Sequence, residues 1–236
     1  MLRAAFLILV GVIMPILAIQ SERGLRTTPF PPRRQIWTSV IVTQLVLLGI
    51  AAITAWRTGL DLLPPPSLQA EHFLAAAALL LAALALVFGG ERFMSPKHLQ
   101  RLLRMGPKHP RDLGWWTALS LTAGIAEEFV YRGVFFSILL PLLGGDILLA
   151  ALISAAAFAL AHAIQGVLGG LVIFVFALGF HWLVWYTGSL YYAMAVHVLY
   201  DAAAGLYLLY IVAPRRPELL RDEPAETRDS VDAPAT

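Results

Sequence analysis

Residues 121–140 read LTAGIAEEFVYRGVFFSILL, an apolar stretch that carries Glu127, Glu128 and Arg132 near its middle. Only five of the hundred residues from 114 to 213 bear a formal charge, and three of them lie in this stretch. A charged side chain near the centre of a hydrocarbon layer costs about 3 kcal/mol or more, so such residues usually face a cavity or pair with one another. The stretch therefore predicts a membrane-spanning helix that holds a functional polar cluster.

The composition of the whole chain indicates a polytopic membrane protein. Hydrophobic residues make up 59% of the 236 residues, charged residues only 14%, and the mean hydropathy is +0.74. A soluble domain with a hydrated surface needs more charge than this. The chain has no cysteine, which excludes disulfides, thiolate metal ligands and a cysteine nucleophile. We expect the lipid bilayer as its environment and no nucleic acid as a partner, because the basic residues lie in short loops.

The apolar segments predict an all-α bundle of about seven transmembrane helices, since about 20 residues cross a bilayer of about 30 Å. The predicted spans are residues 4–19, 37–56, 72–88, 113–143, 147–165, 167–186 and 190–212. The first is interpreted as an uncleaved span, because residues 18–21 lack a small-x-small cleavage pattern. The fourth is long enough to be a re-entrant pair instead of one tilted helix. We divide the chain into residues 1–112 with three helices and basic loops, a core at 113–213, and a disordered tail at 214–236.

The distribution of basic residues predicts the orientation. They concentrate in the first loop, in the loop at residues 91–111 and in the tail, with Arg23, Arg26, Arg33, Arg34, Arg215 and Arg216 among them. Two spans lie between the first loop and the loop at residues 91–111, and four lie between that loop and the tail. Because both numbers are even, all three basic segments fall on one side of the membrane. The positive-inside rule assigns that side to the cytoplasm and the amino terminus to the outside. The Ala-, Leu- and Arg-rich composition favours a bacterial cell membrane.

The spacing of the three charged residues divides them into a pair and a single carboxylate. Glu128 and Arg132 are four residues apart, so they are neighbours on one helix face and Arg132 can neutralise Glu128. Glu127 lies about 100° around the helix and has no partner on its own face, so we expect it to look into a cavity. The alternative is that all three form a structural ion-pair network.

Two further segments each place polar or aromatic side chains one helical turn apart. Phe158 precedes His162 by four residues, and His197 precedes Asp201 by four. The carboxylate can fix the tautomer of His197 or share a ligand with it. We assign the other intramembrane histidine, His181, to a helix-to-helix hydrogen bond outside the site. The remaining donors suit a water-activating site, either direct or through a bound divalent metal such as zinc; they are Glu127, His162, His197 and Asp201.

These motifs resemble the type II CAAX prenyl endopeptidases and their bacterial relatives, the CAAX protease and bacteriocin-processing family. That family has E-E-x-x-x-R, then F-x-x-x-H, then H-x-x-x-N or H-x-x-x-D on successive helices of a four-helix core. The chain has the same order, with Glu127, Glu128 and Arg132, then Phe158 and His162, then His197 and Asp201. The resemblance covers residues 113–212, and the first three spans match only in being hydrophobic.

The resemblance implies peptide-bond hydrolysis inside the membrane, on a membrane-embedded or lipidated protein. Glu127 would be the general base on a water, His162 would assist it, and His197 with the residue at 201 would stabilise the oxyanion. Asp201 replaces the Asn of the prenyl-protease branch and donates a hydrogen bond only when protonated. An ionised Asp201 fits better as a partner of His197 or as a metal ligand, and relatives with Asp there are classed as metalloproteases.

Other functional classes fit the sequence less well. The H-E-x-x-H motif of zinc site-2 proteases, the G-x-S-x nucleophile of rhomboids and the ordered Y-D and G-x-G-D motifs of presenilins are absent. A transporter that uses the carboxylates as a proton relay remains an alternative, but the sequence lacks the inverted repeat expected of many transporters. The closest alternative is a non-proteolytic member of the same fold, acting as a membrane scaffold, a maturation factor or an immunity protein.

Overall fold

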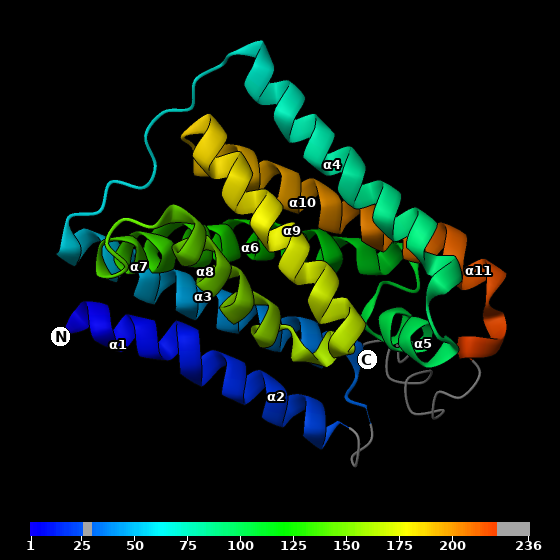
Figure 1. Cartoon of the computed structure of the whole chain (residues 1–236). Coiled ribbons are helices and arrows are strands. Elements are labelled where there is room, and N and C mark those ends of the chain that lie inside the picture. Colours follow the sequence, from blue (N-terminus) through cyan, green and yellow to red (C-terminus); the bar gives the residue numbers. More distant parts are fainter. Residues whose placement is uncertain (26–29, 221–236) are drawn as a thin grey trace, which may run out of the picture.

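The computed structural model describes residues 1–25 and 30–220, and every regular element within these ranges is helical. The helices form one bundle, with α1 and α2 along one side and α4 along the opposite side (Figure 1). Five helices of the described part are long and apolar enough to cross a membrane; they span Leu2–Gly24, Arg33–Thr58, Ala70–Phe93, Ala163–Thr187 and Leu190–Arg215. The predicted all-α fold of an integral membrane protein is therefore confirmed.

The N-terminal half of the bundle consists of long apolar helices. Its elements are α1 (Leu2–Ile8), the π-helix η1 (Leu9–Ile13), α2 (Met14–Gly24), α3 (Arg33–Thr58) and α4 (Ala70–Gly90). Pro15 has no N–H to donate to the carbonyl of Gly11, and the wider turn η1 directly precedes it. Gly59 ends α3 in the left-handed conformation with φ of 69°, which a residue without Cβ adopts at little cost.

The basic loop between α4 and the core contains an amphipathic helix that the hydropathy pattern does not predict. The loop comprises η2 (Glu91–Phe93), α5 (Pro96–Met105) and η3 (Pro110–Asp112). Ser95 caps α5 by accepting a hydrogen bond from the N–H of His98 at 3.3 Å. Leu99 and Leu103 are buried against Val212. The apolar face of α5 thus closes one end of the bundle, where Figure 1 also shows α11.

Part of the predicted disordered tail is folded. The chain continues as α11 (Ala213–Arg215) and η7 (Pro217–Leu220), and the Gln100 side chain donates to the carbonyl of Leu219 at 3.2 Å. Residues 214–220 therefore pack on α5, because Leu219 and Leu220 join its apolar cluster. The rest of the predicted tail, 221–236, and Arg26 of the first loop lie outside the described residues.

Asp112 ties the start of the core to α3. Its Oδ2 accepts hydrogen bonds from the N–H groups of Lys108 and His109, each at 3.0 Å, and lies 3.5 Å from NH1 of Arg33. Burial, with Arg33 and Arg104 nearby, lowers the pKa of the Lys108 amine to about 8, although Asp112 opposes the shift. These contacts fix the depth at which the next helix enters the bundle.

The core begins with one long helix. Its three parts are α6 (Leu113–Glu127), the π-helix η4 (Glu128–Phe135) and α7 (Phe136–Leu142), and they follow one another without a break. Residues 113–142 therefore form a single helix and not the re-entrant pair considered above. The remaining core elements are α8 (Ile147–Ala161), η5 (Ala163–Gln165), α9 (Gly166–Thr187), α10 (Leu190–Tyr207) and η6 (Leu208–Val212). α8 is shorter than the predicted span 147–165, because His162 ends it and Gly166 turns the chain with φ of 76°.

α6 occupies the centre of the bundle, packed between α3 and α10. The approach of α6 to α10 is close at Gly124, where a Cβ atom would stand 2.5 Å from Cγ2 and 2.8 Å from the backbone nitrogen of Val198. α4 covers α10 from outside, and α2 covers α8. This packing brings residues near 127, 162 and 197 to the same level of the bundle.

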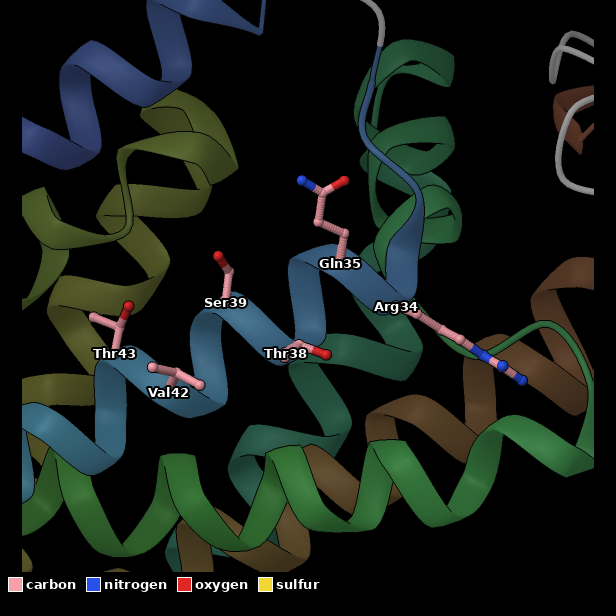
Figure 2. Close-up of a pocket in the computed structure, with 6 residues that line it drawn as sticks. All are labelled: Arg34, Gln35, Thr38, Ser39, Val42 and Thr43. Carbon is pink, nitrogen blue, oxygen red and sulfur yellow. The ribbon is translucent and has the colours of Figure 1, made fainter. Parts of the chain in front are cut away.

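A polar hollow lies on the outward face of α3, away from the charged and histidine motifs described above. It has a volume of about 500 Å³ and is lined by Arg34, Gln35, Thr38, Ser39, Val42 and Thr43. Figure 2 shows Gln35 and Ser39 on the side of α3 that faces away from α6. None of the motif residues lines this hollow.

Candidate active site

The structure brings the six charged and histidine residues of the motifs together from three helices. Glu127 is the last residue of α6, Glu128 and Arg132 lie in η4, and His162 follows the end of α8. His197 and Asp201 lie one turn apart on α10. The cluster has a sealed half, formed by Glu128 and Arg132, and a more open half, formed by Glu127, His162, Asp201 and Nε2 of His197.

The sealed half is an ion pair with no solvent access. Both side chains are 0% exposed, and NH1 of Arg132 lies 3.3 Å from Oε1 of Glu128. None of the guanidinium nitrogens has a hydrogen-bond partner in the described part of the chain. The cation instead lies over the rings of Phe158 at 4.3 Å and Phe180 at 5.3 Å. Because a buried charge is stable only when it is compensated, the pair and the two rings hold each other in place.

His197 connects the two halves. Its Nδ1 lies 2.8 Å from Oε1 of Glu128, and its ring stacks on Phe180 with centroids 5.4 Å apart. An ionised carboxylate only accepts hydrogen bonds, so Nδ1 carries the proton. Nε2 therefore faces Oε2 of Glu127, at 3.8 Å, and Oδ2 of Asp201, at 3.7 Å.

His162 is fixed by the backbone of its own helix. Its Nδ1 donates to the carbonyl of Phe158 at 2.8 Å, and its ring lies against that of Phe158 with centroids 4.4 Å apart. This bond leaves Nε2 as the acceptor of the neutral imidazole. Nε2 lies 3.7 Å from Oε2 of Glu127. The four-residue spacing of Phe158 and His162 is thus used for orienting the imidazole.

Glu127 is the point on which the site converges. Its Oε2 faces Nε2 of both histidines at 3.7 and 3.8 Å, distances too long for direct hydrogen bonds and suited to a bridging water. Its side chain is 17% exposed, that of His162 is 23% and that of Asp201 is 27%. The open half is therefore reachable from outside, whereas Glu128 is not.

The segment with this geometry was compared with known proteins. Residues 109–203 match the family model described as Type II CAAX prenyl endopeptidase Rce1-like. This segment is similar to CAAX-type intramembrane proteases. The match contains the three motifs, so the resemblance inferred from them is confirmed. It covers less than half of the chain. No curated protein and no solved structure matches the chain.

Two residues outside the motifs support the Rce1-like segment. Trp116 Nε1 donates to the carbonyl of Asp201 at 2.9 Å, and its ring occupies the space that a side chain at Gly205 would fill. Ser154 Oγ donates to the carbonyl of Tyr131 at 2.9 Å, within the π-helical turn. The first contact holds α6 against α10, and the second holds η4 against α8. Neither residue belongs to a recognisable spacing pattern.

The π-helix η4 and one contact from α3 are features that sequence reasoning missed. π-helical turns occur often at functional sites, and η4 contains both members of the sealed ion pair. Gln44 of α3 donates from Nε2 to Oε1 of Glu127 at 2.9 Å. The sequence offers a signal for Gln44, because a buried amide in an apolar span needs a partner. His181 was expected to make a helix-to-helix hydrogen bond, but its buried Nε2 has no hydrogen-bond partner among residues 1–25 and 30–220, and its ring packs on Phe136.

The donor atoms suit a divalent metal in kind but are spaced widely. Four acceptor atoms gather in the open half, from Glu127, His162, His197 and Asp201. Zinc bonds such atoms at about 2.0–2.2 Å, which places tetrahedral ligands about 3.3 Å apart. The separations here are 3.7–3.8 Å, and no group of three or more acidic or histidine side chains in the described ranges is arranged to hold a metal ion. A metal would require these side chains to move closer together.

Proposed function

We propose that this protein is an intramembrane endopeptidase that hydrolyses a peptide bond in a membrane-embedded or lipidated protein. The observation that carries the proposal is the position of Oε2 of Glu127, 3.7 and 3.8 Å from the Nε2 atoms of His162 and His197. A carboxylate beside two oriented imidazoles is a suitable general base for a water molecule. The similarity of residues 109–203 to CAAX-type proteases supports the same reaction.

The residues of the open half divide the reaction between them. Glu127 takes one proton from the water, whose other hydrogen is hydrogen-bonded to Nε2 of His162. The water oxygen then attacks the carbonyl carbon. The carbonyl becomes an oxyanion, to which His197 as the imidazolium donates from Nε2. The oxyanion then returns to a carbonyl as the C–N bond breaks and Glu127 passes its proton to the leaving nitrogen. The products are an amine and a carboxylic acid, which ionises to a carboxylate. Glu128 and Arg132 act by holding His197 and the helix turn in position.

A metal-assisted form of the reaction is a second candidate, favoured by the four acceptor atoms in the open half. Glu127, His162, His197 and Asp201 would hold a divalent cation such as zinc, which supplies Lewis acidity when bound. A chelator distinguishes the two forms. Activity that falls on treatment with a chelator and returns with added zinc requires the metal, and activity that persists in the purified, metal-depleted protein does not.

The orientation follows from the basic segments. α5 and α11, which carry Arg and Lys, lie at the same end of the bundle (Figure 1). We propose that this end faces the cytoplasm and the amino terminus the outside, as the positive-inside rule favours. We propose a bacterial cell membrane because the chain is rich in Ala, Leu and Arg. A non-proteolytic scaffold, maturation factor or immunity protein is the competing function, since the same ion pair and helix packing would serve it.

The test compares the membrane proteomes of cells with the wild-type protein and with Glu127→Gln at matched abundance, with protein termini read by mass spectrometry. The control is Glu71→Gln, because Glu71 lies on α4 and is exposed. Termini present in the wild type and the control but absent in Glu127→Gln establish proteolysis and identify the substrate. Identical termini in all three strains, together with rescue of the deletion phenotype by Glu127→Gln, would falsify the enzyme and leave the scaffold.

A further inference from the structure

The carboxylate of Glu127 has a partner from the N-terminal half of the chain. Gln44 lies in the middle of α3, well outside residues 109–203, and its Nε2 donates to Oε1 of Glu127 at 2.9 Å. Gln44 is only 6% exposed. α3 packs along α6, so the contact is made across a continuous helix interface. The two helices place an amide and a carboxylate against each other inside an apolar layer.

The hydrogen bond from Gln44 fixes the plane of the Glu127 carboxylate relative to the two histidines. Oε1 is occupied by Gln44, whereas Oε2 faces Nε2 of His162 and of His197. A carboxylate without this bond could rotate about its last torsion, so that neither oxygen would face both histidines. General base catalysis depends on placing the accepting oxygen within reach of the proton that it removes. Gln44 thus fixes the torsion on which the proton transfer depends.

The amide of Gln44 is itself imperfectly satisfied. Its Oε1 is buried and has no hydrogen-bond partner in the described part of the chain. The opposite orientation of the amide would set this oxygen against the carboxylate oxygen of Glu127, two acceptors facing each other, so the orientation is determined. An apolar side chain of the same size would avoid both the buried amide and its orphaned oxygen. A residue retained only for stability would not have this arrangement.

We propose that Gln44 is a positioning residue of the active site, which holds the general base Glu127 so that Oε2 faces the two histidines. The proposal rests on the proposed peptidase function. It also assigns α3 to the catalytic unit, although α3 lies outside the Rce1-like segment. The hollow beside the contact is small, about 10 Å³, and is lined by Gln44, Leu47, Ala126, Glu127, Val130 and Tyr131. The space leaves the amide little freedom to turn away from the carboxylate.

The experiment uses the full-length protein in proteoliposomes and a peptide that spans the cleavage position revealed by the Glu127-dependent terminus. The variant Gln44→Met keeps the length of the side chain and removes both hydrogen-bonding groups. Gln35→Met is the matched control, because Gln35 lies nine residues, or two and a half turns, away on the opposite and exposed face of α3. Rates, KM and the melting temperature are measured for all three proteins.

The expected result separates positioning from a structural role. We expect Gln44→Met to lower kcat by about 10²-fold with KM within about twofold, the effect of misplacing a reacting group. Its melting temperature should stay close to that of the wild type, because the loss of the donor to Oε1 of Glu127 and the removal of the buried amide with its orphaned oxygen oppose each other. The control should match the wild type in every quantity. If Gln44→Met accumulates poorly, Gln44→Asn, which keeps an amide but shortens its reach, should show the same fall in kcat.

Three results overturn the proposal. One is an unchanged kcat in Gln44→Met, and another is a fall in kcat that follows a lower melting temperature and is shared by Gln35→Met. The third is a Gln44→Asn variant in which KM rises and the melting temperature falls while kcat stays unchanged. A failure of the peptidase function itself looks different, since Glu127→Gln then leaves the protein termini unchanged before any Gln44 variant is made.

Discussion

Two adjacent glutamates lie in two different regions of one site, and the contrast shows how a membrane protein can hold carboxylates for different purposes. Glu128 is fully buried, paired with Arg132 at 3.3 Å and bound to Nδ1 of His197 at 2.8 Å. Glu127 is 17% exposed, and its Oε2 has no contact closer than 3.7 Å to either histidine. The sealed region has its charge neutralised within the fold, and the open region leaves its charge available for a reactant.

The comparison is tested most strongly by removing the charge from each glutamate in turn. Glu127→Gln should lower cleavage by about 10³-fold or more while the protein accumulates normally, because the proposed general base is lost and no buried ion pair is broken. Glu128→Gln should instead lower the amount of folded protein, because Arg132 is left as an uncompensated buried cation. Quantitative immunoblots and the rate of appearance of the Glu127-dependent terminus measure both. The division into a sealed and an open region is contradicted if the two variants show the same abundance and the same rate of cleavage.

The second prediction concerns the ion pair of the sealed region. Arg132→Met should destabilise the protein by about 3–5 kcal/mol, because the buried Glu128 then loses its cationic partner and keeps only the contact with Nδ1 of His197. The double variant Glu128→Gln with Arg132→Met should recover most of this loss, since neither charge then remains. Thermal unfolding of the purified protein in detergent measures the effect. Equal stability of the single and double variants would mean that the carboxylate finds another partner.

The third prediction concerns the contact that holds the two regions side by side. Gly124→Ala puts a Cβ atom 2.8 Å from the backbone nitrogen of Val198, so α6 and α10 must separate. We expect a loss of about 1–3 kcal/mol in stability and reduced cleavage, because His197 moves away from both glutamates. Gly49→Ala is the control, since nothing lies within 4 Å of a Cβ there. A Gly124→Ala variant as active and stable as the control contradicts the close packing.

The smallest effect is expected at the edge of the sealed region. Ser154→Ala removes the hydroxyl that donates to the carbonyl of Tyr131 in η4 and should lower stability by about 1 kcal/mol. Cleavage per folded molecule should stay unchanged, because the open region is not touched. Ser39→Ala on the outward face of α3 serves as the reference. A change in kcat with Ser154→Ala would show that the π-helical turn influences Glu127 directly.

Much of the fold could be predicted because hydrophobic length is a local property. The long apolar runs correspond to helices in the structure, and the motifs occur at helical spacing, as with Glu128 and Arg132. The boundaries were less predictable. α8 ends at Ala161 and not at residue 165, because the turn at Gly166 depends on the packing of η5, which hydropathy does not report. α5 was missed because its apolar face is too short to register as a span.

The sequence by itself determined the class of the protein and the residues of the site. Low charge and apolar runs of membrane length exclude a soluble fold, and rare charges at fixed spacing single out Glu127, Glu128, Arg132, His162, His197 and Asp201. Only the tertiary structure decided which carboxylate is sealed, how the carboxylate of Glu127 is turned toward the histidines, and that Gln44 contacts it. These features depend on contacts between helices up to 83 positions apart in the chain, and no local pattern encodes the distance between such side chains.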